Sequence, residues 1–257
     1  MLELFLAELK RIWTEFIRYP VEAISGVIII TSLFYGLFLS ARYIAGPTLQ
    51  FGDRLDGIVV GYVLWTLVIF IANSIAISLQ IEAQTGTLEQ LFLSPFGALR
   101  VFLARAIASL TFNLVLMLSI LLLTIVLTKR HLNFPPSLLL PFITVILGAY
   151  GLAFMIGALA LLFKRIQQLL GLFQFVLLFL LMTPTETWTG SLRVLRLLLP
   201  MTIGAGELRN LMVRNQSLDL SVFVLALLNG VMYLAFGLVV FRWAERKAKL
   251  QGILSGY

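Results

Sequence analysis

The sequence contains no cysteine and a single histidine, His131. Disulfide bonds, thiolate chemistry and cysteine-based metal sites are therefore excluded, and one histidine cannot build a histidine-based zinc site. Charged residues are also scarce. They make up 12% of the chain, about half of the roughly 25% that is usual in soluble domains.

The sequence patterns of several enzyme classes are missing as well. There is no P-loop pattern, so the chain does not bind ATP by that device, and neither a His-Glu-x-x-His nor a Gly-x-Ser-x-Gly pattern occurs. An intramembrane protease or transferase would need paired ionisable residues in its apolar segments, which are nearly free of them here. We predict that the chain is not an enzyme, and we expect no catalytic residue, no cofactor and no metal.

Apolar residues are abundant, at 60% of the chain. Several apolar runs approach or exceed the roughly 20 residues that cross a bilayer. The sequence therefore predicts an all-α polytopic membrane protein, with residues 1–257 forming a single transmembrane domain. The formal net charge is +7, but the basic residues stand in ones and twos at the ends of apolar runs, as topology signals do. We expect no nucleic-acid partner.

Six transmembrane spans are predicted, preceded by an interfacial helix within residues 1–20. Residues 2–19 place an apolar side opposite a charged side and include Trp13, which is typical of a helix lying in the membrane interface. Tyr19-Pro20 ends this helix. The predicted spans are residues 21–41, 57–80, 103–128, 138–163, 166–184 and 218–241.

The connection between the last two spans, residues 185–217, mixes charged residues with leucine, glycine and proline. Its apolar stretch Val194–Leu199 is too short to span a bilayer. We interpret this region as short re-entrant helices that enter or rest on the outer membrane surface. Backbone at such a depth must be covered by protein or water.

Six spans place both termini on one side of the membrane. That side holds eleven of the nineteen lysine and arginine residues. The positive-inside rule therefore places both termini and residues 82–97 in the cytoplasm. We expect a multi-pass protein of the bacterial plasma membrane, in contact with membrane lipid.

Residues 82–97 form a polar break between the second and third predicted spans. Gly86 interrupts the preceding helix, Thr87 is predicted to be an N-cap, and Gln90 completes a capping box. Pro95 ends the new helix within about two turns. The pattern predicts a short cytoplasmic helix between two membrane spans.

This short helix has an apolar face, because Leu88, Leu91 and Phe92 fall at positions i, i+3 and i+4. A simple turn would not need such a face, and a helix of this kind suits docking into a groove on another protein. We expect the three apolar side chains to fill the groove, while Glu82 and Glu89 fix its register by charge. The alternative is an interfacial helix that lies on lipid.

Small residues repeat every four positions in the fourth predicted span, at Ala149, Ala153 and Gly157. This spacing allows two helices to approach closely. We interpret the three residues as a packing surface rather than as a surface that binds substrate.

Five polar residues within the predicted spans could line a translocation route. The alternative, which we favour for any single residue, is an interhelical hydrogen bond worth on the order of 1 kcal/mol. Few charges in the spans also argue against a proton- or sodium-coupled transporter, so energy would have to come from a partner. The five residues are Asn73, Ser74, Asn113, Gln174 and Asn229.

A family resemblance lies in Gly86-Thr87-Leu88-Glu89-Gln90-Leu91, followed by Ser94-Pro95. These residues resemble the cytoplasmic segment after the second span of type-2 ABC transporter permeases, which forms the coupling helix that contacts the ATPase subunit. The resemblance implies that two permease chains, identical or different, pair around a central route. It also implies that two P-loop ATPase subunits dock from the cytoplasm.

The resemblance extends to the region before the last span. Family members often carry a proline followed about nine residues later by an arginine, and Pro200, Glu207 and Arg209 are similar to that outer re-entrant element. Leu199 replaces the asparagine that usually precedes the proline. Family substrates include drugs, lipids, lipid-linked glycans, haem and ions, and the resemblance favours export.

Three functions are open at this point. The first is the permease subunit of an ABC exporter for a hydrophobic or amphipathic molecule, or for haem or an ion. The second is an autonomous channel or secondary carrier, in which residues 82–97 lie on lipid. The third is an assembly subunit that transports nothing.

Overall fold

A computed structural model describes residues 2–45, 52–85, 98–129, 131–163 and 166–250. These residues form nine α-helices and two short 3₁₀ helices, and no strand occurs among them. The helices are α1 (Leu2–Arg18), α2 (Pro20–Ala45), α3 (Gly52–Thr85), α5 (Ala98–Thr128), α6 (Leu139–Leu162), α7 (Gln167–Met182), α8 (Ser191–Leu198), α9 (Thr202–Met212) and α10 (Leu220–Leu250), with η1 (Pro136–Leu138) and η2 (Thr185–Thr187).

Five of these helices, α2, α3, α5, α6 and α10, are long and apolar enough to cross a membrane. The predicted fifth span, residues 166–184, is instead the 16-residue helix α7. At 1.5 Å per residue α7 is about 24 Å long, less than the roughly 30 Å of a hydrocarbon core. The expected count of six full spans is therefore not confirmed, although the all-helical membrane-spanning architecture is.

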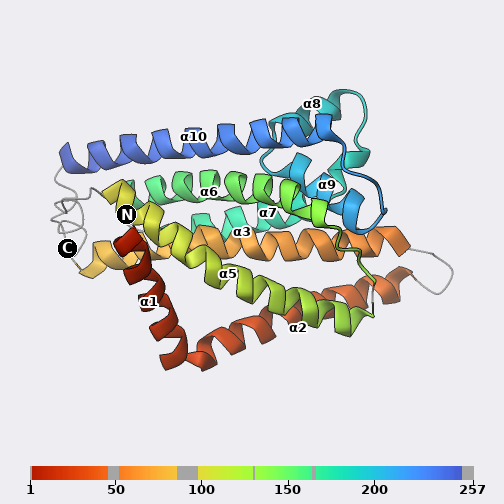
Figure 1. Cartoon of the computed structure of the whole chain (residues 1–257), viewed down its shortest axis with the longest axis horizontal. Coiled ribbons are helices and arrows are strands. Elements are labelled where there is room, and N and C mark those ends of the chain that lie inside the picture. The colour runs from red at the N-terminus through yellow and green to blue at the C-terminus, as the bar shows by residue number, and fades with distance from the viewer. Residues whose placement is uncertain (1, 46–51, 86–97, 130, 164–165, 251–257) are drawn as a thin grey trace.

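The long helices lie side by side, while α1 crosses the long axis of the bundle at one end (Figure 1). We call this end the α1 end. It also holds the C-terminal end of α3, the start of α5 and the C-terminal end of α10. The opposite end, which we call the α9 end, holds α8, α9 and the start of α10. The bundle thus keeps α1 and α9 apart.

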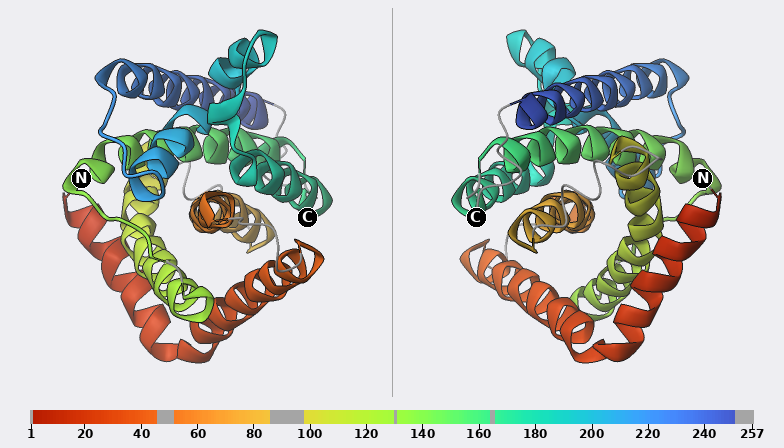
Figure 2. Two further views of the ribbon diagram at one scale, coloured as in Figure 1. Left: turned by 90° about the vertical axis from the view of Figure 1, so that its right-hand side faces the viewer. Right: turned by 90° about the vertical axis from the view of Figure 1, so that its left-hand side faces the viewer.

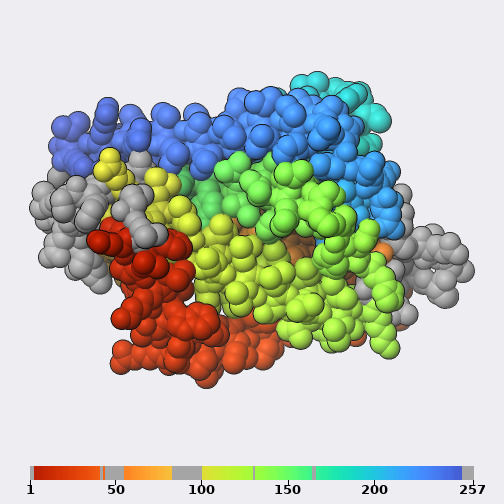
Figure 3. Space-filling view, in the orientation of Figure 1, coloured from red at the N-terminus to blue at the C-terminus, as the bar shows by residue number. Residues whose placement is uncertain are grey.

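Helix α1 lies against α5, as the space-filling view shows (Figure 3). Phe16 of α1 contacts Phe112 of α5 edge to face, with ring centroids 5.2 Å apart. The break after Arg18 follows from Pro20, which is well suited to the first turn of a new helix. The amphipathic helix predicted over residues 2–19 is confirmed as a helix, and its place in a membrane interface stays a prediction.

Viewed along the bundle, α3 occupies the centre and is surrounded by α2, α5, α6 and α7 (Figure 2). Helices α3 and α6 are the two mostly buried spans, whereas most of α2 and α10 is exposed. The large apolar side chains on these exposed faces suit contact with lipid or with another membrane chain. The core of this chain is therefore built around α3 and α6.

Small residues bring α6 close to its neighbours on two sides. Ala149 and Ala153 are fully buried, and a Cβ at Gly157 would lie 3.0 Å from both Ile75 and Leu79 of α3. The packing role predicted for this repeat is confirmed. On another side, a Cβ at Gly151 would collide with the backbone of α10 at Tyr233 and Leu234.

We predict that Gly151→Val destabilises the protein by about 1–3 kcal/mol, because the side chain forces α6 away from α10. Thermal unfolding of the purified chain in mild detergent would measure the change. Gly171→Ala is the matched control, since a Cβ at Gly171 meets nothing within 4 Å and alanine favours a helix by roughly 0.5–1 kcal/mol. Equal unfolding temperatures for the two variants would contradict the close approach of α6 and α10.

Candidate functional site

Of the residues predicted to couple the chain to an ATPase, only Glu82 lies within the described part of the structure, near the end of α3. The helix predicted in residues 87–94 therefore stays a prediction. The residues outside the described ranges are Gly86, Thr87, Leu88, Glu89, Gln90, Leu91, Phe92, Ser94 and Pro95.

The helices on both sides of this segment are joined by a buried arginine. Arg105 of α5 is 8% exposed, and its Nη1 donates to Oε1 of Glu82 at 2.7 Å and to Oγ of Ser78 at 3.3 Å. Its Nε donates to Oε1 of Glu8 on α1, also at 3.3 Å. One guanidinium group therefore holds α1, α3 and α5 together at the α1 end.

The charges around Arg105 are balanced. Glu8 also binds Arg11, with Nε and Oε2 3.1 Å apart, so two guanidinium groups face the two carboxylates of Glu8 and Glu82. We call Glu8, Arg11, Glu82 and Arg105 the α1-end cluster. Sequence reasoning singled out Glu82 as a contact for a partner but missed its ion pair with Arg105 of the same chain. The available signal was Arg105 itself, a charge at the start of a predicted span.

A second buried arginine organises the α9 end. The guanidinium of Arg209 on α9 binds the carboxylate of Glu186, with Nη2 2.8 Å from Oε2 and Nε 3.1 Å from the same oxygen. Its Nη1 donates to the carbonyl of Leu181 at 2.7 Å, and Nη2 donates to the carbonyl of Thr183 at 3.1 Å. Both charged side chains are at most 4% exposed. Arg209 thereby ties α9 to η2 and to the end of α7.

Glu207 and Pro200, the other two residues of the predicted outer re-entrant element, are close to Arg209 in sequence but have different surroundings. Glu207 is buried on α9, and desolvation raises the pKa of its carboxyl, while a hydrogen bond from Asn210 at 3.2 Å opposes this rise. Pro200 stands just before α9, next to Met201, which has a left-handed backbone with φ 61°. The entry of this element into a membrane stays a prediction.

The five polar span residues lie in three separate places. The Nε2 of Gln174 on α7 donates to Oδ1 of Asn73 on α3 at 3.2 Å. Ser74 and Asn113 line a cavity beneath α1, and the Oγ of Ser74 lies 3.5 Å from that of Ser109. Asn229 of α10 is at the α9 end, where its Nδ2 donates to the carbonyl of Leu197 at 2.9 Å. Within this chain the five residues do not share one surface, and their role in a route stays a prediction.

We predict that Glu186→Gln lowers the free energy of unfolding by about 3–5 kcal/mol, because it leaves the charge of Arg209 buried without a counter-ion. The double variant Glu186→Leu/Arg209→Met should recover much of this loss, since it removes both charges of the pair. Thermal unfolding in detergent would measure both. As a control, Glu245→Gln removes a partner from the more exposed ion pair with Lys249 and should change stability by at most about 1 kcal/mol.

A comparison with protein families gives a match over most of the chain. The matching family is described as ABC-2 type transporter, and the match covers residues 3–213, from α1 through α9. Comparison with curated proteins gives no match. The helical bundle with several apolar spans agrees with a membrane transport component that is not itself catalytic. The chain belongs to the ABC-2 type transporter family, as a permease of the membrane.

Proposed function

We propose that the chain is the membrane-spanning subunit of an ATP-driven ABC exporter. A second permease chain would complete the translocation route, and two copies of a separate P-loop ATPase subunit would supply energy. The observation that carries this proposal is the α1-end cluster, in which Arg105 binds both Glu82 and Glu8. Because of it, the helices on both sides of residues 86–97 are fixed to α1.

This arrangement supports a specific mode of coupling. A partner that presses on residues 86–97 would displace the end of α3 and the start of α5 together. Arg105 joins these helices to α1, so the three would move as one rigid group, as in other transitions of packed helices. Helix α3 is central in the bundle, which gives the displacement a direct path toward the α9 end.

In this proposal residues 1–257 act as a single permease domain, with the α1 end and both termini in the cytoplasm of a bacterial plasma membrane. The α9 end, with the Arg209–Glu186 pair and the outer element, would then face outward. The cargo we propose is a hydrophobic or amphipathic molecule such as a drug, a lipid or a lipid-linked glycan. The high hydropathy and the few charged residues of the spans support this class over small inorganic ions.

We predict that Leu91→Asp/Phe92→Asp releases the ATPase, because it places charge on the face that should fill the partner groove. A pull-down of the chain in mild detergent with mass spectrometry of its partners would show the loss. Leu93→Asp is the control, since residue 93 falls off the predicted face. If no ATPase co-purifies with the well-folded wild type, and flux in liposomes occurs without one, the chain is an autonomous carrier.

We also predict that Arg105→Met preserves ATPase binding but lowers ATP-driven transport by about tenfold. The variant leaves residues 86–97 intact and removes charge-assisted contacts worth roughly 1.5–3 kcal/mol, which exceeds the 1.36 kcal/mol of a tenfold rate change. Flux into proteoliposomes that contain both subunits would measure it. Arg100→Met, at an exposed position of the same helix, should transport normally, and an equal loss in both variants would contradict the role of Arg105.

A further inference from the structure

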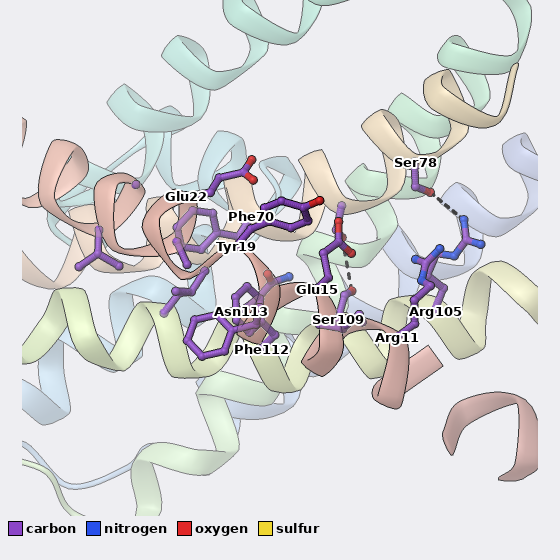
Figure 4. Close-up of a pocket in the computed structure, with 17 residues that line it drawn as sticks. Arg11, Glu15, Tyr19, Glu22, Phe70, Ser78, Arg105, Ser109, Phe112 and Asn113 are labelled. Atoms are coloured by element: carbon purple, nitrogen blue, oxygen red, sulfur yellow. Dashed lines mark hydrogen bonds between the residues drawn. The ribbon is translucent and has the colours of Figure 1, made fainter. Parts of the chain in front are cut away.

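A cavity of about 370 Å³ lies beneath α1, between α1, α2, α3 and α5. Most of its wall is apolar, with Phe16, Phe70 and Phe112 from three different helices among the lining residues. Figure 4 shows the cavity with its polar residues distributed along the same walls. Its volume is within the range of small-molecule sites, roughly 300–1,000 Å³, and such sites usually combine apolar walls with a few polar groups.

Two carboxylates of this cavity have no counter-ion. Glu15 of α1 and Glu22 of α2 both line it, and neither forms an ion pair within the described ranges of the chain. The cationic lining residues Arg11 and Arg105 are already paired in the α1-end cluster. The lining therefore holds two carboxylates without an ion pair, both on exposed residues, beside aromatic rings. Carboxylates and aromatic rings both attract organic cations.

An independent observation on the opposite wall also indicates a ligand. Asn113 of α5 is 6% exposed, and its Nδ2 has no hydrogen-bond acceptor among the described residues. In Figure 4 its carboxamide lies among the labelled rings of Tyr19, Phe70 and Phe112. A buried N–H donor without an acceptor is unfavourable. An oxygen atom of a molecule in the cavity would satisfy it.

We propose that this cavity binds a cationic amphiphile. Its organic cation would lie at Glu15 and Glu22, its apolar body between the phenylalanine rings, and an ester or ether oxygen would accept from Nδ2 of Asn113. Glu22 is close to the start of α2, and Asn113 is two turns further along α5 than Arg105 of the α1-end cluster. The ligand would therefore lie between the start of α2 and the middle of α5.

Two sources can supply this chemistry: the ammonium headgroup of a membrane lipid, or a soluble amphiphilic cation that partitions into the membrane. Both present a positive charge, oxygen atoms and an apolar body, and in the lipid some of these oxygen atoms belong to an anionic phosphate. As a binding site the cavity is independent of ATP-driven transport. The further statement that the ligand of this cavity is the transported cargo rests on the proposed function.

The test is the binding of rhodamine 123 to the purified full chain in dodecyl maltoside, measured by fluorescence polarisation. Rhodamine 123 is a cationic xanthene methyl ester, and fluorescein methyl ester has the same scaffold with a negative charge. We expect the cationic dye to bind and the anionic dye not to bind. Equal binding of the two dyes would overturn the proposal.

Variants then locate the site. Glu15→Gln/Glu22→Gln should raise the dissociation constant of rhodamine 123 about tenfold or more, since charge-assisted contacts are lost. Glu3→Gln/Glu245→Gln removes the same net charge away from the cavity and should bind as the wild type does. If the first double variant also binds as the wild type does, the site is not this cavity.

Asn113→Leu tests the opposite wall. It should raise the dissociation constant about fivefold while leaving the unfolding temperature unchanged or higher, because it removes an unpaired buried donor. Unchanged binding in this variant would overturn the assignment of Asn113 to the ligand. Dye binding and thermal unfolding both use the isolated chain. Dye binding can therefore fail while the ATPase pull-down succeeds, and the pull-down can fail while the dye binds.

Competition distinguishes the two sources. Short-chain phosphatidylethanolamine carries a primary ammonium group, and short-chain phosphatidylglycerol has no cation. Displacement of rhodamine 123 by the first lipid but not by the second would support a lipid amine as the occupant. Displacement by neither would support a soluble cation. Displacement by the anionic lipid alone would overturn the proposal.

Discussion

A guanidinium group buried in an apolar helix bundle needs acceptors for its N–H groups and a counter-ion for its charge, because the surroundings offer little water to replace them. The chain meets this demand once at each end. Arg209 binds a carboxylate and two carbonyl oxygens at the α9 end, and Arg105 binds Glu82 and Glu8 at the α1 end. Each arginine fixes helices that are distant in sequence, so the two ends are rigid units.

Between these ends the bundle depends on close packing rather than on charge. Gly151 lets α6 lie against α10, and Gly157 lets it lie against α3. Ala149 and Ala153, which form a four-residue repeat with Gly157, are fully buried. Apolar contact alone does not drive association inside lipid, so small residues that allow backbones to approach supply much of the attraction. The cavity beneath α1 stands apart from this pattern, because the carboxylates of Glu15 and Glu22 in its lining form no ion pair and the buried Nδ2 of Asn113 has no acceptor among the described residues.

Much of the architecture is predictable from local sequence. The amphipathic pattern of residues 2–19 and Pro20 place the break between α1 and α2 within one residue, because proline restricts backbone conformation directly. The predicted fifth span, residues 166–184, is not confirmed as a full span. Composition over residues 166–184 does not show that α7 stops at Met182, where Thr183 turns to an extended conformation and its carbonyl accepts from Arg209. That contact involves a residue far along the chain.

The sequence by itself determined the membrane class, the helical content and the positions of most helices, because apolar run length and the placement of proline act locally. Only the tertiary structure decided which polar residues meet. Glu82 has the same local sequence whether it faces a partner or Arg105, and Glu186 gives no local sign of its pairing with Arg209, 23 positions away. Charge pairing across a bundle depends on which helices become neighbours, and packing settles that choice through residues such as Gly151.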